Sequence, residues 1–280
     1  MRSGNTSACF LSLNINQLLD LTMLIKLISR LRFYVYFLGL IMLLLPVAAL
    51  TEQAISQTED ELINAAGRGQ LSRIQSLLTE SHSFDQSTLN QALIQATVNG
   101  QDKIVEFLLN NGADINVLIE ENRSLLHLAA RDDRIDVVRV LLAKGAKKDA
   151  VSSDGTTALM IAAQYSRIEI LRLLIQAGAD IDAGNQEGIT ALMYAARLNF
   201  QNGVQDLLRA GANVNKSANN GATSLMLAAQ NGYQNITKAL LAAGADPNIK
   251  AGNDATALFL AQRYNHRDVI KILRDAGARQ

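Results

Sequence analysis

Apolar residues along most of the chain follow the spacing of short amphipathic helices. In residues 154–183 they predict one short helix that Thr157 can cap and a second helix from about Ile168 to Ala177. Gly178 stands where a left-handed residue ends the second helix, and residues 180–188 have the polar composition of turns. Neither helix is long enough to be stable alone in water, so the unit needs neighbours.

The same unit recurs every 33 residues. Several independent columns of glycine, alanine and leucine keep this step in one register. The glycine column is Gly112, Gly145, Gly178, Gly211, Gly244 and Gly277, and the alanine column is Ala96, Ala129, Ala162, Ala195, Ala228 and Ala261. A fixed period of this size indicates stacked supersecondary units, each touching only its neighbours.

Each unit carries the order Asp/Asn-Gly-x-Thr-x-Leu, Ala-Ala, Leu-Leu and Gly-Ala-Asp/Asn-x-Asn/Asp. This order resembles the ankyrin repeat over about residues 58–280. The resemblance implies an all-α ankyrin-repeat solenoid of helix-turn-helix units with short β-hairpin finger loops. The seven expected repeats cover about residues 58–85, 86–118, 119–151, 152–184, 185–217, 218–250 and 251–280.

Some positions depart from the family pattern. The family's Thr-Pro-Leu-His motif reads Ser124-Leu-Leu-His127 once, and its proline is missing from every repeat, so we expect lower stability but the same fold. The first repeat is degenerate and the last has a charged second helix, as terminal repeats facing water do. Gly203 takes a core Ile/Val position with Phe200 nearby to fill the space. We interpret this pair as local tolerance, and a flexible joint is the alternative.

An apolar segment without charges precedes the repeats, from Phe33 to Leu50, and basic residues stand before it. Small residues at 47–49 predict a secretory signal cleaved after Ala49. The alternative is an uncleaved membrane anchor over residues 33–50, whose length is borderline for a bilayer. In either case the repeats leave the cytoplasm. We expect an exported, periplasmic protein in a Gram-negative bacterium, or one anchored in the inner membrane with its repeats facing the periplasm.

The start of the chain is longer than a signal peptide needs. Met23 would open a well-proportioned signal over residues 23–49, so we interpret residues 1–22 as an upstream extension that is not native. Residues 50–57 are polar and are expected to form a short tether to the repeats.

Charge and cysteine content exclude several classes of function. Lys and Arg number 26 against 26 Asp and Glu, with an excess of three basic residues in 1–49 and of three acidic residues in the rest. The slightly acidic repeats therefore favour no nucleic acid partner. The single cysteine, Cys9, excludes an internal disulfide and the usual zinc sites, and no cofactor or metal is expected.

The residues form no catalytic constellation. The resemblance implies that His127 braces the loop backbone, and His82 and His266 fall in turns where we expect them to be solvated. Ser124 and His127 are a helical turn apart with no oxyanion site, which indicates a capping motif rather than a nucleophile and its base. We therefore expect neither an enzyme nor a small-molecule substrate.

The resemblance implies a concave binding face made by the finger loops and the first helices. Its finger residues are Glu120, Glu121, Asp154, Glu187 and Asn220. Its helix residues are Arg131, Gln164, Arg197, Gln230 and Arg263, and beside them Asp132, Tyr165, Leu198, Asn231 and Tyr264. Arg and Tyr are common binding hot spots. The alternative is a solvated face without a partner.

These observations predict a monomeric, non-catalytic module that binds a protein partner in the bacterial envelope. A membrane-anchored scaffold and an effector that acts on host proteins are the alternatives.

Overall fold

The computed structural model describes Met23, Gln53 and residues 55–80 and 84–279, and it divides the chain into two units, 1–58 and 59–280. The predicted upstream extension, the apolar segment 33–50 and the cleavage site at Ala49 lie outside the described residues. Gln53 and residues 55–57 of the predicted tether are helical. None of the described helices has the length and apolar character that crossing a membrane requires.

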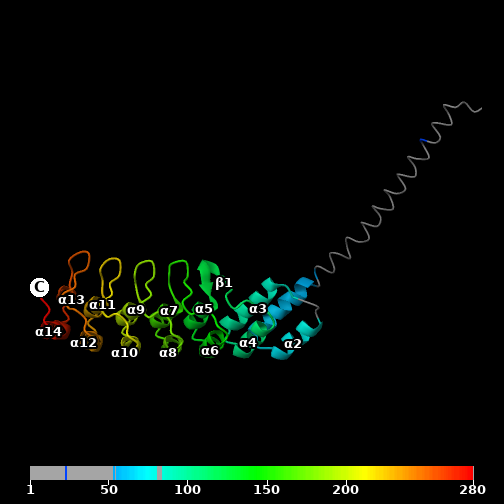
Figure 1. Ribbon diagram of the computed structural model, residues 1–280, viewed down its shortest axis with the longest axis horizontal. Coiled ribbons are helices and arrows are strands. Elements are labelled where there is room, and N and C mark those ends of the chain that lie inside the picture. Colours follow the sequence, from blue (N-terminus) through cyan, green and yellow to red (C-terminus); the bar gives the residue numbers. More distant parts are fainter. Residues whose placement is uncertain (1–22, 24–52, 54, 81–83, 280) are drawn as a thin grey trace, which may run out of the picture. The chain divides into compact units, whose positions relative to one another are not determined.

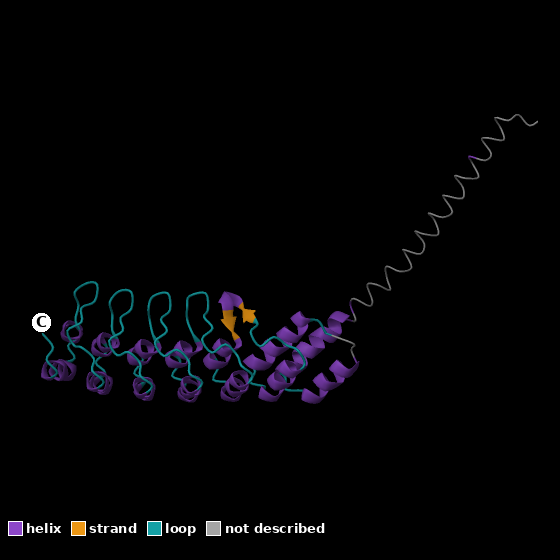
Figure 2. Ribbon diagram, viewed as in Figure 1, coloured by secondary structure: helices purple, strands orange, loops and turns teal. Residues whose placement is uncertain are grey.

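Within residues 59–280 the helices form antiparallel pairs that stand side by side in a row, with loops projecting on one side (Figures 1 and 2). The first helices of the pairs, here called inner helices, are residues 59–67, α3 (Gln86–Val98), α5 (Leu125–Arg131), α7 (Ala158–Gln164), α9 (Ala191–Arg197), α11 (Ser224–Gln230) and α13 (Ala257–Arg263). The second, outer helices are α2 (Leu71–Glu80), α4 (Asp102–Asn110), α6 (Ile135–Ala143), α8 (Ile168–Gln176), α10 (Gln201–Arg209), α12 (Gln234–Ala242) and α14 (Arg267–Asp275).

Local side-chain chemistry sets the ends of these helices. The hydroxyl oxygen of Thr157 accepts a hydrogen bond from the Met160 amide at 3.3 Å, which confirms the predicted cap of α7. Thr190, Thr223 and Thr256 cap α9, α11 and α13 in the same way. Gly178 follows α8 with φ +75°, as its column position predicts.

The core is a continuous layer of aliphatic side chains and alanines that runs through all the helix pairs. Leu159 and Ala162 of α7 and Ile170 and Leu174 of α8 are at most 1% exposed, and their counterparts in other repeats are similarly buried. The alanines let adjacent inner helices approach closely, while leucines of the outer helices fill the space behind them. Each short helix is therefore stabilised by its neighbours rather than by its own sequence.

The finger loops are narrow hairpins between an outer helix and the next inner helix. The first consists of β1 (Leu118–Ile119), η1 (Glu120–Asn122) and β2 (Arg123–Ser124), with Leu118 paired to Ser124 in antiparallel register. In the next four fingers an amide bonds the carbonyl four residues later, as from Ser152 to Thr156 at 3.0 Å. Their tips require a left-handed residue, and Gly155 supplies it with φ +81°.

Repeat 86–118 differs from the full repeat that the sequence predicts. Its inner helix α3 has 13 residues where α7 has 7, and the extra turns occupy the place of a finger. Asp85 accepts a hydrogen bond from the Thr88 amide at 2.7 Å and so starts the helix early. The row of fingers therefore begins with β1 and β2.

The position of Gly203 is filled as the sequence suggests. A Cβ atom at this residue would lie 2.3 Å from two ring carbons of Phe200, so the aromatic ring occupies the volume of the missing side chain. The alternative of a flexible joint stays a prediction.

Candidate functional site

A groove lies between the finger loops and the inner helices, and its upper wall is a hydrogen-bonded stack of fingers. One tip amide of each finger bonds a tip carbonyl of the finger before it: Ser153 to Glu121 at 2.7 Å, Gln186 to Asp154 at 2.9 Å, Asn219 to Glu187 at 2.9 Å and Gly252 to Asn220 at 2.8 Å. We call these four contacts the finger ladder. The predicted finger residues Glu121, Asp154, Glu187 and Asn220 therefore each have a backbone carbonyl committed to the finger ladder.

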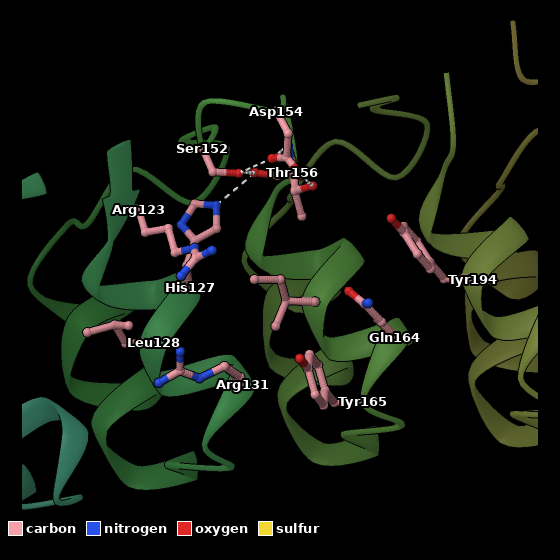
Figure 3. A pocket seen from close by; sticks show the side chains of 11 residues that line it. Arg123, His127, Leu128, Arg131, Ser152, Asp154, Thr156, Gln164, Tyr165 and Tyr194 are labelled. Carbon is pink, nitrogen blue, oxygen red and sulfur yellow. Dashed lines mark hydrogen bonds between the residues drawn. The ribbon is translucent and has the colours of Figure 1, made fainter. Parts of the chain in front are cut away.

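A pocket of about 310 Å³ opens in the groove between the first and second fingers; we call it the N-terminal pocket (Figure 3). Its walls come from two fingers and from α5, α7 and α9, and its lining residues are Arg123, His127, Leu128, Arg131, Ser152, Asp154, Thr156, Ile161, Gln164, Tyr165 and Tyr194. Of the residues predicted for the binding face, Arg131, Asp154, Gln164 and Tyr165 meet here.

His127 joins two repeats at the back of this pocket. Its Nε2 lies 2.8 Å from the Thr156 carbonyl oxygen, so this nitrogen carries the proton and donates. Nδ1 then accepts from the Ser124 hydroxyl at 2.7 Å and from the Ser124 amide at 3.2 Å. Burial lowers the pKa of His127, which keeps the ring neutral in this arrangement. The predicted bracing and capping roles are confirmed.

Asp154 is turned inward upon its own finger. Its Oδ1 accepts from the Ser152 hydroxyl at 2.6 Å and the Thr156 amide at 3.0 Å, and its Oδ2 accepts from the Thr156 hydroxyl at 2.8 Å. The hydrogen bond from Ser152 is the main reason that the pKa of Asp154 lies below its usual range. This carboxylate shapes the finger and the pocket wall at the same time.

Two arginines of the predicted row already have partners. Arg131 donates two hydrogen bonds to Asp132, at 2.7 and 3.0 Å, which raise the pKa of Arg131 and lower that of Asp132. The guanidinium carbon of Arg197 lies 5.2 Å from the ring centre of Tyr194. Both arginines are thus held at the groove with defined positions, which lowers the entropy they would lose on binding.

The column beside the arginines is the C-cap position of the inner helices. Asp132, Tyr165, Leu198, Asn231 and Tyr264 end α5, α7, α9, α11 and α13 in turn. Tyr165, Leu198 and Tyr264 are 43–48% exposed, whereas Asn231 bonds the Leu227 carbonyl of its own helix at 2.8 Å. This column therefore offers exposed apolar area at three points.

Sequence reasoning missed a column one turn earlier on the same helices. Leu128, Ile161, Tyr194, Leu227 and Leu260 keep the 33-residue step and line the groove floor beneath the fingers. Their spacing of three residues before the Arg/Gln row was the available signal. Arg123 was missed as well, because it lies on β2 rather than on a helix.

The structure corrects the prediction for one histidine. His266 was expected to be solvated, but it is half-buried and its Nε2 lies 2.9 Å from the Gln230 carbonyl oxygen of the preceding repeat. His82 lies outside the described residues. No group of three or more metal-ligating side chains converges in the described part of the chain.

Comparison with known proteins identifies the family of the chain. A profile described as "Ankyrin repeats (3 copies)" matches residues 62–152, 126–218 and 192–280. The chain belongs to the ankyrin-repeat family. Ankyrin repeats are in general protein–protein interaction modules, and the family is generally non-catalytic.

A solved ankyrin-repeat structure is similar as well. The crystal structure of an ankyrin repeat domain from Acinetobacter baumannii AYE is 32% identical, with a TM-score of 0.64. The match covers 67% of this chain and 98% of that one. No curated protein matches the chain.

Proposed function

We propose that this ankyrin solenoid binds a protein partner of the bacterial envelope through the groove between its fingers and inner helices. The supporting observation is the N-terminal pocket, where Gln164 and Tyr165 are exposed beside guanidinium groups fixed by their own neighbours. A rigid, preformed surface with Arg and Tyr side chains loses little entropy on docking. The protein acts as a monomer that tethers, chaperones or inhibits its partner.

The location rests on the N-terminal sequence. The uncharged segment 33–50, with basic residues before it and small residues at 47–49, favours export. N-terminal sequencing of the protein produced in a Gram-negative host tests this. Cleavage after Ala49 would give a mature chain beginning at Leu50, whereas an intact N-terminus in the membrane fraction would favour the anchored form.

The binding face is tested by charge reversal on opposite sides of the solenoid. The groove variant carries Arg197→Glu and Arg263→Glu, and the matched control carries Lys238→Glu and Lys271→Glu on outer helices α12 and α14. All four positions are exposed, and each double variant changes the charge equally. Crosslinked pull-downs from envelope extract, followed by mass spectrometry, compare each variant with the wild type.

We expect a protein that the wild type and the control capture and the groove variant loses, with equal helical circular dichroism for all three. A protein that the wild type and the groove variant capture but the control variant loses would place the binding face on the outer helices. A wild type that captures nothing would contradict the proposal.

A further inference from the structure

The groove has a second pocket of different chemistry. It has a volume of about 430 Å³ and opens between α11 and α13 under the last two fingers; we call it the C-terminal pocket. Ala222, Leu227, Ala255 and Leu260 contribute apolar walls. None of the residues that line it is charged, whereas Arg123, Arg131 and Asp154 line the N-terminal pocket.

Two exposed asparagines that line this pocket are held by hydrogen bonds within their own fingers. Asn220 Oδ1 accepts from the Ala222 amide at 3.0 Å, and Asn253 Oδ1 accepts from the Ala255 amide at 3.2 Å. These bonds fix the orientation of both side chains through their oxygens. Their Nδ2 groups, which make no hydrogen bond within the described residues, remain to donate to the backbone carbonyls of a bound segment.

We infer that the C-terminal pocket takes a large apolar side chain from an extended segment of the partner, flanked by uncharged residues. This inference rests on the proposed binding function of the groove. A charged side chain would lose hydration here without gaining a counter-charge, while an apolar one buries area against leucine and alanine. The asparagine amides then hold the backbone on either side of that residue.

The inference predicts the direction in which the partner lies along the solenoid. Its apolar anchor lies in the C-terminal pocket, and its hydrophilic part lies over the N-terminal pocket, which Arg123 and Arg131 line. Leu227 is half-buried and lies outside the buried core, so its substitution changes the pocket wall without removing a core side chain.

Selection of random 12-residue peptides on phage, using the full-length chain, tests this occupant. The pocket variant is Leu227→Glu, and Leu227→Met keeps the apolar wall. The charge-matched control is Gln205→Glu, at an exposed position on outer helix α10 outside the groove. Circular dichroism establishes that each variant is folded. Peptides selected on the wild type are synthesised, and their affinities for all four proteins are measured by fluorescence anisotropy.

We expect the selected peptides to share one large apolar residue between uncharged neighbours. Leu227→Glu should weaken their binding about tenfold or more, since burying such a side chain contributes more than the free energy of a tenfold change. Leu227→Met should stay within about threefold, a conservative exchange in volume and polarity. Gln205→Glu, outside the groove, should leave the binding unchanged.

Two other outcomes would contradict the inference in different ways. Peptides that carry charges instead of the apolar residue, and that bind Leu227→Glu as well as wild type, would overturn the C-terminal pocket and leave the groove as a binding face. Selection of no peptide above background on the wild type would count against the proposed function of the groove itself.

Discussion

At the scale of single residues, His127 shows how one side chain joins two repeats. It caps its own helix through Ser124 and reaches the next finger through Thr156. The corresponding residues of the next three repeats are Met160, Met193 and Met226, which pack in the core at 1–3% exposure instead. The same helical position therefore serves either as a polar brace or as packing volume.

The neutral state of His127 predicts a dependence of stability on pH. Its folded pKa lies below the ordinary value of about 6.5 that holds in the unfolded chain. The stabilising contribution is therefore complete above pH 6.5 and is lost as the pH falls through that value toward the folded pKa. Urea unfolding between pH 7.5 and 5 should show this fall, and His127→Gln should flatten it. An unchanged slope in the variant would contradict the assignment.

Glycines in two columns have a left-handed backbone but different surroundings. Gly211, after α10, has φ +91° with nothing within 4 Å of an added Cβ atom. Gly221, in a finger tip, has φ +80°, and its Cβ atom would lie 2.8 Å from the Ala251 Cα atom of the next finger. The fingers thus stack backbone against backbone, at a distance that excludes any side chain.

These two glycines form a matched pair for substitution. Gly211→Ala should lower the free energy of unfolding by about 1 kcal/mol, the cost of a left-handed alanine. Gly221→Ala has the same conformational cost and also forces two fingers apart, so it should cost clearly more. Chemical denaturation measures the loss of unfolding free energy in both variants. Equal losses would contradict the expectation, because they would show that separating two fingers costs no free energy.

At the scale of elements, α10 has a glycine at a core position, and a side chain from outside the helix fills the space. Phe200 at the N-cap of α10 covers Gly203, whereas the preceding repeat has Arg167 and Ile170 at these two positions. Arg167 instead donates to the Arg131 carbonyl at 3.2 Å, a contact that phenylalanine cannot make. In this repeat, therefore, the N-cap residue supplies the volume that the core position lacks.

A double-mutant cycle tests that coupling. Gly203→Ile should destabilise the protein despite its better helix propensity, because its side chain overlaps the Phe200 ring, and Phe200→Arg should leave a cavity costing about 3 kcal/mol. The double variant restores the Arg/Ile pair of the preceding repeat. Its cost should fall below the sum of the single costs by at least about 1 kcal/mol. Additive costs in chemical denaturation would contradict the pairing.

At the scale of the whole repeat domain, the finger ladder is a second line of contacts beside the helical core. At its N-terminal end the ladder lacks an acceptor, because α3 occupies the place of the finger that would precede β1. The Glu120 amide stands at the position of the four ladder donors, but no described residue accepts its hydrogen. The ladder therefore starts with an unpaired donor and continues through four bonded ones.

Amide hydrogen exchange followed by NMR should reveal this difference. The amides of Ser153, Gln186, Asn219 and Gly252 should be protected, and the amide of Glu120 should exchange fast, since its opening needs no contact to break. The Gly211→Ala variant serves as a control that leaves the fingers unchanged. Fast exchange at all five amides would show that the ladder does not persist in solution.

The family resemblance implied the bracing role of His127. The repeat period, the paired helices, the Thr157 cap and the Gly178 turn followed from the sequence pattern itself. These features depend on residues within one unit and on a step of 33 residues, so a linear pattern contains them. The family resemblance rested on the same local signals, and it was sufficient for the fold.

The side chains that the groove presents depend on contacts that form only in the folded protein. Arg131 is paired with Asp132, His266 bonds Gln230 of the preceding repeat, and a finger is absent before β1. The contrast between a charged and an uncharged pocket also depends on side chains from two fingers and two or three helices meeting across repeats. A repeating pattern predicts where each residue lies along the backbone of its repeat. Which side chains bond across repeats depends on the particular residues that meet there.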